Sequence, residues 1–427
     1  MGAERGLDAL KDVSTANAGL NLRYAAVRRQ SLNLCEPLEI EDYGVQPMED
    51  ASPPKWHLAH TTWFFETFIL KQRVPAYEPF HESFETLFNS YYNGVGRPFP
   101  RAQRGYLSRP TVEQVKAYRS YVDDAMQVLL GDGQDQPLID QVTLGLHHEQ
   151  QHQELLLTDL KYNFGHNPLF PVYGGGPKVG AQADELRFTS FDGVLAEIGA
   201  TGDFCFDNEL PRHEVLLQPF QLANRLVTNG EYLQFMEDGG YGRPDLWLSD
   251  GWSKVQSANW SAPLYWREQD GRWMEYRLDG LHEVDLNLPV VHVSGFEAAA
   301  FAAWSGARLP TEFEWEHAAA TCPVRGTFVE SECFHPTARV GAAGEDLHQL
   351  YGDAWQWTSS SYAPYPGYRP LPGALGEYNG KFMSSQLVLK GGSCVTPRSH
   401  TRVSYRNFFY PPDRWQFSGI RLAQDVE

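Results

Sequence analysis

Residues 144–164 read LGLHHEQQHQELLLTDLKYNF, a long run rich in Leu, Glu, Gln and Lys. These residue types favour an α-helix, and the run contains no Pro. On a helix, His148 and His152 lie one turn apart on the same face, which Leu144 extends as an apolar stripe. Both imidazoles should therefore point into a core. Two histidines in this geometry can bind one metal ion, so the run predicts a metal site.

The same letters also fit a different kind of metalloenzyme. Residues His148–His152 read HEQQH, the HExxH pattern of zinc peptidases, in which Glu149 would activate a metal-bound water. The later Gly and third His of one peptidase class do not follow. A third ligand could come from Glu185 downstream, or from WHLAH at residues 56–60, which fits better because it lies on another predicted helix. The pair therefore indicates a metal without identifying it.

The composition limits the class of protein. A chain of 427 residues with 42% hydrophobic residues is long enough for two domains with buried cores. Its net charge of −19 argues against nucleic-acid binding, and no stretch has the roughly 20 apolar residues that cross a bilayer. The charged N-terminus lacks the apolar segment of a signal peptide, and the five cysteines are scattered without a CxxC motif. We therefore expect a cytoplasmic protein with neither a nucleic-acid nor a membrane partner.

The N-terminal part of the sequence, residues 1–165, reads as a helical bundle. Thr111 is the expected N-cap of one helix. The connection at residues 79–110 is longer than a bundle turn needs, and loops of this length are often functional. Metal sites in such bundles are built from inward side chains on facing helices. Apolar residues recur at helical spacing in residues 15–34, 56–72, 111–131 and 137–163.

Gly and Pro residues interrupt the helical pattern at residues 166–190, which we expect to be a linker. Beyond it, in residues 191–427, short apolar runs alternate with Gly, Pro, Asp and Asn. The chain is therefore predicted to be an α+β protein of two domains, a four-helix bundle and an irregular C-terminal domain. Capping boxes mark three helix starts in the second domain, at Thr228–Glu231, Ser294–Glu297 and Thr311–Glu314.

Several short sequence blocks stand out in order along the chain. In the N-terminal half they are WHLAH at 56–60 and HEQQHQE at 148–154. In the C-terminal half they are VTNGEY at 227–232, GARLPTEFEWE at 306–316, GDAWQWT at 352–358, VLKGGS at 388–393 and GIRL at 419–422. These blocks resemble those of one enzyme family, the sulfoxide synthases of ergothioneine biosynthesis, over nearly the whole chain, and their order and the pairing of the two domains are specific. The resemblance implies a DinB-like metal-binding bundle followed by a C-type-lectin-like, or formylglycine-generating-enzyme, domain.

The resemblance also implies a metal and its ligands. Members of the family bind non-haem iron(II) through three histidines, which here fall on His60, His148 and His152. Three ligands on one side of the ion leave positions for a sulfur donor, a substrate imidazole and O₂. The neighbouring His57 and His147 are then expected to be structural, and His147 lies about 100° around its helix from His148.

The family joins cysteine or γ-glutamylcysteine to C2 of the imidazole of hercynine, N-α-trimethylhistidine, and oxidises the sulfur to a sulfoxide with O₂. By resemblance, Gln151, Asn407 and Phe408 lie at the hercynine. The chain's 12 Trp, 21 Tyr and 24 Phe suit a pocket with aromatic walls, and aromatic faces bind trimethylammonium groups well. Arg101 and Arg104 match a pair that binds the carboxylate of the sulfur donor, a role that suits a planar guanidinium.

Two positions depart from the family pattern. Members that use γ-glutamylcysteine carry an acid where this sequence has Phe409, so we expect free cysteine to be the donor. The family also uses a tyrosine to donate a proton or hydrogen atom to reduced oxygen. No tyrosine before Val388 aligns with it, and Tyr91 and Tyr92 on the long loop are our candidates.

Other interpretations stay open at this point. A selenium-using relative has the same two domains, and ovothiol-forming relatives attach sulfur to C5 of histidine, usually with a fused methyltransferase for which 427 residues leave no room. The HExxH peptidase requires zinc and a catalytic Glu149, whereas in a synthase Glu149 would support the ligands or lie on the helix surface. A formylglycine-generating oxidase needs a close cysteine pair near residues 391–393, where only Cys394 occurs. A non-catalytic binding protein is the remaining alternative.

Overall fold

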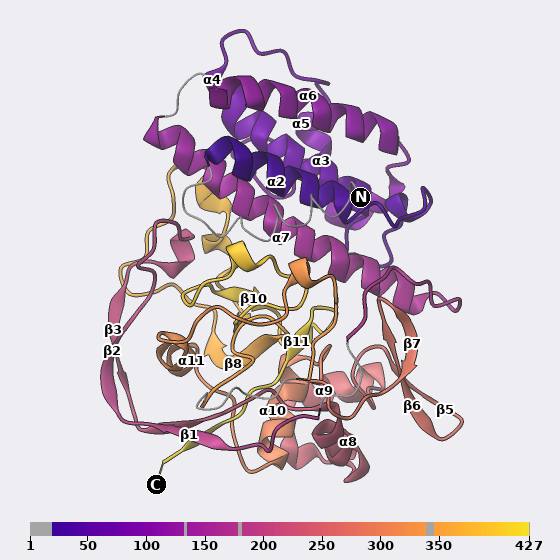
Figure 1. The fold of residues 1–427 in the computed structure, drawn as a ribbon, viewed down its shortest axis with the longest axis vertical. Coiled ribbons are helices and arrows are strands. Elements are labelled where there is room, and N and C mark those ends of the chain that lie inside the picture. Colours follow the sequence, from indigo (N-terminus) through magenta and orange to yellow (C-terminus); the bar gives the residue numbers. More distant parts are fainter. Residues whose placement is uncertain (1–18, 132–134, 178–181, 339–345, 427) are drawn as a thin grey trace, which may run out of the picture. The chain divides into compact units, whose positions relative to one another are not determined.

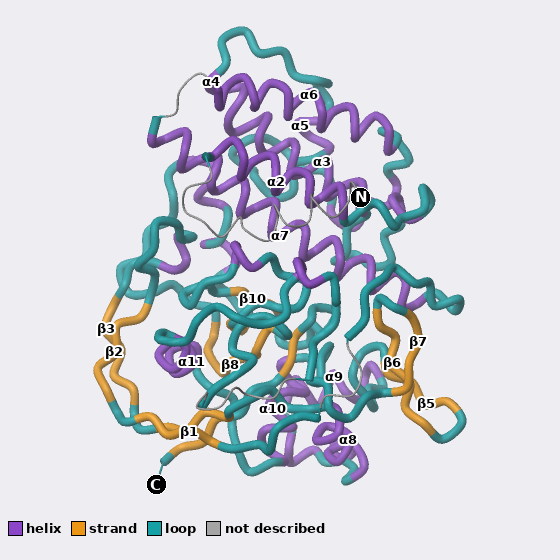
Figure 2. Tube along the Cα trace, in the orientation of Figure 1, coloured by secondary structure: helices purple, strands orange, loops and turns teal. Residues whose placement is uncertain are grey.

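The chain folds as two compact units. The computed structural model describes residues 19–131, 135–177, 182–338 and 346–426 (Figure 1). Unit 1 comprises Met1–His166 together with Pro372–Tyr378, and unit 2 comprises Asn167–Leu371 and Asn379–Glu427. The described strands all belong to unit 2, whereas unit 1 is helical (Figure 2). This arrangement confirms the α+β class, and it adds to unit 1 a short segment that the sequence did not single out.

Unit 1 is built on four long helices at the predicted places. Residues 15–18 of the first predicted helix lie outside the described residues. Thr111 Oγ1 accepts a hydrogen bond from the Gln114 amide at 3.2 Å, as expected of an N-cap. None of the helices in the described ranges is long and apolar enough to cross a membrane. The helices are α2 (Leu20–Asn33), α3 (Pro54–Phe65), which continues through a π-helical turn (Glu66–Leu70) into α4 (Lys71–Arg73), the short α5 (Phe84–Leu87), α6 (Val112–Gly131) and α7 (Gln136–His166).

Helix α3 lies at the centre of the bundle. It packs against α6 and α7, and every one of its residues is buried. Gly145 of α7 allows the close approach, because a Cβ atom there would lie 2.7 Å from the Phe65 ring. A glycine inside a helix costs about 1 kcal/mol relative to alanine, so tight packing is the reason for it here. One turn further along α7 stands His148, which is thereby held close to α3.

Unit 2 combines short helices with small sheets. The three predicted capping boxes are present at the starts of α8, α10 and α11, with the Thr or Ser hydroxyl and the Glu carboxylate each accepting a backbone N–H. The helices are α8 (Asn229–Glu237), α9 (Ser249–Ala258), α10 (Gly295–Trp304) and α11 (Glu312–Ala319).

The sheets of unit 2 are small and mostly antiparallel. A three-stranded sheet has the order β1 (Phe188–Phe191), β4 (Phe220–Ala223), β12 (Ala423–Asp425). A four-stranded sheet has the order β10 (Asn407–Phe409), β9 (Leu387–Lys390), β8 (Trp355–Ser361), β11 (Ser418–Gly419). Strands β2 (Val194–Ile198) and β3 (His213–Leu217) form a ribbon, and β5 (Trp266–Gln269), β6 (Arg272–Arg277) and β7 (Gly280–Glu283) form a further sheet.

A buried polar junction connects three sequence blocks of unit 2. The side-chain oxygen of Gln356, in β8, accepts hydrogen bonds from the Trp315 indole and from Arg421 Nε, both at 2.7 Å. All three side chains are fully buried. Buried polar groups need such partners, so the blocks that contain these residues hold one another in place.

Candidate metal centre

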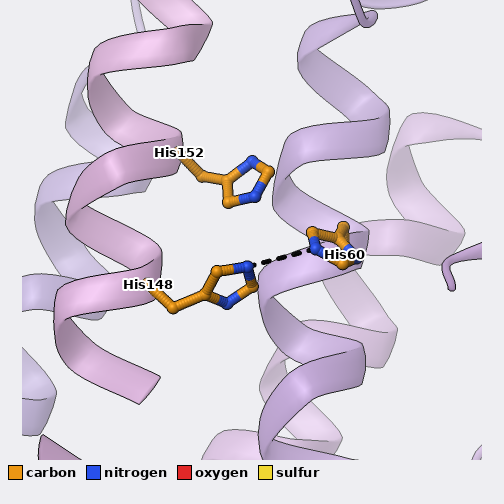
Figure 3. Close-up of side chains that lie close together, drawn as sticks. All are labelled: His60, His148 and His152. Carbon is orange, nitrogen blue, oxygen red and sulfur yellow. Dashed lines mark hydrogen bonds between the residues drawn. The ribbon is translucent and has the colours of Figure 1, made fainter. Parts of the chain in front are cut away.

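Three histidines from two helices of unit 1 point toward one another. His148 and His152 extend from successive turns of α7, and His60 faces them from α3 (Figure 3). The Nε2 atoms of His60 and His148 are 3.2 Å apart. One nitrogen from each of the three rings lies within 4.8 Å of the others. Among the described residues, this trio is the group of His, Cys, Asp and Glu side chains whose spacing suits a metal ion.

The 3.2 Å between His60 Nε2 and His148 Nε2 fits two nitrogen ligands of one ion. Such ligands lie about 2.1 Å from a first-row metal, so two of them at right angles are about 3.0 Å apart. His60 Nδ1 donates to the carbonyl oxygen of Phe88 at 2.5 Å, which leaves the Nε2 lone pair of His60 facing His148. A backbone carbonyl on the other ring nitrogen is the usual support of a metal-binding histidine. The residues present therefore fit a three-histidine metal site.

The surroundings keep the trio neutral, as metal binding requires. Burial lowers the pKa of His60 well below its ordinary value, and the neighbouring His148 lowers it further. Burial likewise lowers the pKa of His148 to about 3, and that of His152 well below 6.5. Neutral imidazoles offer their lone pairs at neutral pH.

Aromatic rings enclose His60. The Trp56 indole stacks on the His60 imidazole, with ring centres 4.5 Å apart and planes at 12°, and Trp63 stacks at 5.4 Å. Both indoles come from α3 itself, at four residues before and three after His60. They fix the plane of the ring and exclude water around it.

The hydrogen bonds of Glu149 do not suit the catalytic base of a peptidase. Glu149 is fully buried, so the surface position considered for it is wrong. Its carboxylate accepts hydrogen bonds from Arg28 at 2.9 Å, from Ser31 at 2.6 Å and from Arg119. Burial by itself would raise its pKa, but the charges of Arg119 and Arg28 outweigh it and lower the pKa to about 2. A carboxylate engaged in this way has no affinity for the proton of a water molecule, which contradicts the zinc-peptidase interpretation.

The two arginines of the long loop have different settings. Arg104 is buried, and its guanidinium lies 3.4 Å from the centre of the Trp56 ring, the same indole that stacks on His60. Its Nη1 donates to Ser52 Oγ at 2.9 Å, while its Nε has no hydrogen-bond partner among the described residues. Arg101 is 53% exposed and binds the carbonyl oxygen of Asp50. Arg104 is thus a buried cation with an unused N–H donor, and its guanidinium contacts the same Trp56 ring that stacks on His60.

The two candidate tyrosines pack against each other. The rings of Tyr91 and Tyr92 stack with centres 4.7 Å apart. Tyr92 is fully buried and contacts Trp63 and Phe68, with ring centres 5.6 Å and 5.2 Å away. Burial raises the pKa of the Tyr92 phenol well above 10. The ring contacts of Tyr92 are those of a core residue.

A third tyrosine, which the sequence did not single out, contacts the trio. Tyr378 lies in the segment that joins unit 1 from far along the chain, and its ring meets that of His148 edge-on at 5.7 Å. Its hydroxyl donates to the side-chain oxygen of Gln151, which was expected near the substrate. The Glu377 carboxylate accepts the backbone N–H groups of Asn93 at 3.1 Å and Gly94 at 2.7 Å. The segment is therefore tied to the long loop of the bundle directly beside its tyrosine.

The remaining predicted substrate residues belong to unit 2. Asn407 and Phe408 lie in β10, where Phe408 stacks on Tyr362 with ring centres 4.1 Å apart and planes at 11°. Phe409, two residues after Asn407, meets Trp415 edge-on. Alternation along a strand puts Asn407 and Phe409 on one face and Phe408 on the other. An aromatic side chain occupies the position at which an acid was considered.

Comparisons with known proteins agree with this architecture. Residues 23–156 match the DinB superfamily, and residues 189–344 and 329–426 match the sulfatase-modifying factor enzyme 1-like domain. The chain is 32% identical over 413 residues to the hercynine oxygenase of Mycolicibacterium smegmatis, a match that covers 88% of this chain and 91% of the relative. It is 32% identical over 408 residues to the hercynine oxygenase of Mycobacterium tuberculosis, with the same coverage. The ergothioneine biosynthesis protein 1 of Schizosaccharomyces pombe is 26% identical over 52% of this chain and 28% of that protein. Because this chain shares both domains and nearly its full length with these oxygenases at 32% identity, it belongs to the hercynine oxygenase family.

Proposed function

We propose that this chain is an iron(II)- and O₂-dependent sulfoxide synthase that joins cysteine to C2 of hercynine in ergothioneine biosynthesis. The names of its relatives support hercynine as the substrate. In the reaction, a C–S bond replaces the C2–H and S–H bonds, and the sulfur gains one oxygen atom. These two changes release four electrons, which reduce O₂ to the sulfoxide oxygen and one water molecule. No further reductant is needed.

The observation that carries the proposal is the set of three neutral imidazoles with facing nitrogens. Iron(II), when bound, supplies the activation of O₂ and the site for the cysteine thiolate. His60, His148 and His152 would hold it, and three protein ligands leave coordination positions for the substrates. The stacked indoles of Trp56 and Trp63 keep water away from this face of the site.

We assign the proton donor to Tyr378 rather than to Tyr91 or Tyr92. Its ring touches that of His148, and its hydroxyl is oriented by Gln151. A general acid must lie within reach of the reacting atoms before its acidity matters. Tyr378 holds its proton on a hydroxyl at the edge of the trio, where oxygen is reduced.

Arg104 is assigned to the carboxylate of the sulfur donor. A buried guanidinium with an unused N–H is stabilised by an anion that completes its hydrogen bonds. Burial and the nearby Arg101 both lower the pKa of Arg104 well below its ordinary value. The charged guanidinium is therefore unfavourable here unless an anion binds beside it. The aromatic Phe409 supplies no carboxylate for a second ammonium group, which supports cysteine over γ-glutamylcysteine.

Two alternatives, a zinc peptidase and a formylglycine-generating oxidase, have less support. The paired Glu149 speaks against peptidase chemistry. The formylglycine-generating oxidase lacks its cysteine pair, since Cys394 is the one cysteine near residues 391–393. Selenium transfer and attachment at C5 of histidine use the same kind of site, and they are decided by the product.

The test is an anaerobic iron(II) titration followed by O₂ uptake with hercynine and cysteine, with the product identified by mass spectrometry. Cysteine, γ-glutamylcysteine and a selenium donor should be supplied in competition, and histidine should replace hercynine in a parallel reaction. We expect one O₂ consumed per hercynine and a product equal in mass to the two substrates plus one oxygen atom minus two hydrogen atoms. Oxygen uptake that does not depend on hercynine would refute the proposal.

A further inference from the structure

His57 connects one histidine of the trio to a buried carboxylate. Its Nδ1 lies 2.9 Å from Nδ1 of His152, and its Nε2 lies 3.1 Å from Oδ2 of Asp159. His57 precedes His60 by one turn of α3, and Asp159 follows His152 by two turns of α7. His57 and Asp159 are both buried, at 3% and 5% exposure, and His152 is half-buried. His57, which was expected to be structural, thus contacts a member of the trio directly.

The order of donors and acceptors follows from the carboxylate. Asp159 Oδ2 also accepts the backbone N–H of Ser52 at 2.8 Å, which fixes the carboxylate as an acceptor. His57 must then donate through Nε2–H. With its N–H on Nε2, His57 offers Nδ1 as an acceptor, and His152 then donates its Nδ1–H across the 2.9 Å contact. The lone pair of His152 is thereby placed on Nε2, the nitrogen that does not face His57.

The three rings of the trio are supported in different ways. His60 donates Nδ1–H to a backbone carbonyl, that of Phe88. His148 Nδ1 is buried without a hydrogen-bond partner among the described residues. His152 is the ring whose tautomer depends on other side chains, and the chain of contacts extends from Asp159 through Ser52 to Arg104, which donates to Ser52 Oγ.

We propose that His57 and Asp159 are positioning residues that hold His152 in its Nδ1–H tautomer and so present its Nε2 to the metal. The proposal rests on the three-histidine site of the proposed function. Supports of this kind are worth about 10- to 100-fold in metal affinity. His57 and Asp159 touch neither substrate nor metal, and they act through His152.

The test measures metal affinity in the absence of substrates. The full-length protein is titrated anaerobically with iron(II) against a chelator, and with cobalt(II), whose visible absorption reports the ligand geometry. We expect about 10- to 100-fold weaker binding for His57→Phe and Asp159→Asn, together with a changed cobalt spectrum. His57→Gln keeps both a donor and an acceptor, and it should bind within about threefold of the parent protein, since the hydrogen bonds persist.

The matched control is His147→Phe, which removes a buried imidazole next to His148 and should leave affinity unchanged. Wild-type affinity in His57→Phe and Asp159→Asn would overturn the proposal, and so would an equal loss in His57→Gln and His57→Phe, which would indicate packing alone. If His57→Phe does not fold, Asp159→Asn decides, since it changes one atom. The metal titration also separates this proposal from the proposed function. A protein whose iron affinity depends on His57 and Asp159 but which does not turn over hercynine would refute only the proposed sulfoxide synthase activity.

Discussion

Helix α7 carries two buried polar clusters on neighbouring residues, and they are built in opposite ways. At Glu149, the carboxylate meets the guanidinium groups of Arg28 and Arg119 and the hydroxyl of Ser31. At His148, one ring nitrogen faces Nε2 of His60 and the other has no hydrogen-bond partner within the described chain. Glu149 lies about 100° around the helix from His148, so the two clusters lie on different faces.

The two clusters differ in their role: the Glu149 cluster stabilises the fold, and the imidazole cluster is the candidate ligand site. Both carboxylate oxygens of Glu149 accept hydrogen bonds, so its charge is balanced and the cluster holds α2, α6 and α7 together. Arg119 Nε is the buried donor of this cluster that has no partner among the described residues. In the imidazole cluster, nitrogen atoms of three rings face one another and His148 Nδ1 has no partner among the described residues, an arrangement that a bound cation would complete. The carboxylate thus has its counter-ions within the chain, whereas the facing imidazoles are the group that a ligand from outside would complete.

The largest expected effect is that of His148→Ala. It removes one of three ligands, so we expect iron affinity to fall by more than the roughly 100-fold that a supporting residue is worth, and sulfoxide formation to cease. The ring is buried, so its removal also leaves a cavity, and circular dichroism should show that the variant is folded before it is titrated. Iron content by elemental analysis and an anaerobic titration are the measurements. Normal iron binding in this variant would mean that the trio is not the site.

Tyr378→Phe should leave iron affinity intact and lower sulfoxide formation by about 10²- to 10⁴-fold, the range of a general acid. Cysteine oxidation to the sulfinic acid should then take over, because O₂ is still activated without the proton donor. Mass spectrometry of both products gives the ratio. Tyr92→Phe is the control, since its ring is packed in the core against Trp63. A switch of products in Tyr92→Phe and not in Tyr378→Phe would reverse our assignment.

Glu149→Gln tests the Glu149 cluster. Loss of the buried negative charge leaves Arg119 without its counter-ion and Arg28 with Asp123 alone, so the free energy of unfolding should fall by about 3–5 kcal/mol. The control is Glu85→Gln, which breaks an ion pair with Lys71 whose partners are 44% and 24% exposed, and should cost less than about 1 kcal/mol. Denaturant unfolding followed by circular dichroism measures both. A peptidase base would instead show lost catalysis with unchanged stability.

Arg104→Lys should raise KM for cysteine by about 10- to 100-fold, since a charge-assisted hydrogen bond contributes about 1.5–3 kcal/mol and lysine cannot stack in the same plane on Trp56. The KM for hercynine should change much less. Arg101→Lys is the matched variant on the same loop, and its exposed side chain should tolerate the change. Equal effects of the two variants would show that the buried arginine has no special role.

These clusters also explain how far the sequence could be interpreted. The spacing of His148 and His152 is a local property of one helix, so it predicted two members of the trio. The WHLAH segment placed two histidines on α3, and spacing could not tell which would face the pair. Both do, His60 at His148 and His57 at His152, because α3 and α7 pack closely along this stretch.

Contacts across the chain left no signal in the local pattern. Tyr378 and Gln151 are 227 residues apart, and the segment that carries the tyrosine belongs to unit 1 although its neighbours in sequence belong to unit 2. The partners of Glu149 come from α2 and α6, so HExxH by itself could not distinguish a base from a structural carboxylate. The four helices and the capping boxes were predictable because their determinants lie within a few residues.

The smallest expected effect is that of Glu377→Gln, and it asks whether the segment that carries Tyr378 needs its tie to the bundle. The glutamine keeps an acceptor for the backbone N–H of either Asn93 or Gly94, and both hydrogen bonds are exposed. We therefore expect the activation free energy to rise by at most about 1 kcal/mol, which lowers kcat by about fivefold. Iron affinity should not change. Because Glu377 would act only through the tyrosine, combining Glu377→Gln with Tyr378→Phe should add nothing to the effect of Tyr378→Phe alone. If the two effects instead multiply, Glu377 contributes to the site independently of Tyr378, and the tie between segment and loop is not what orients the tyrosine.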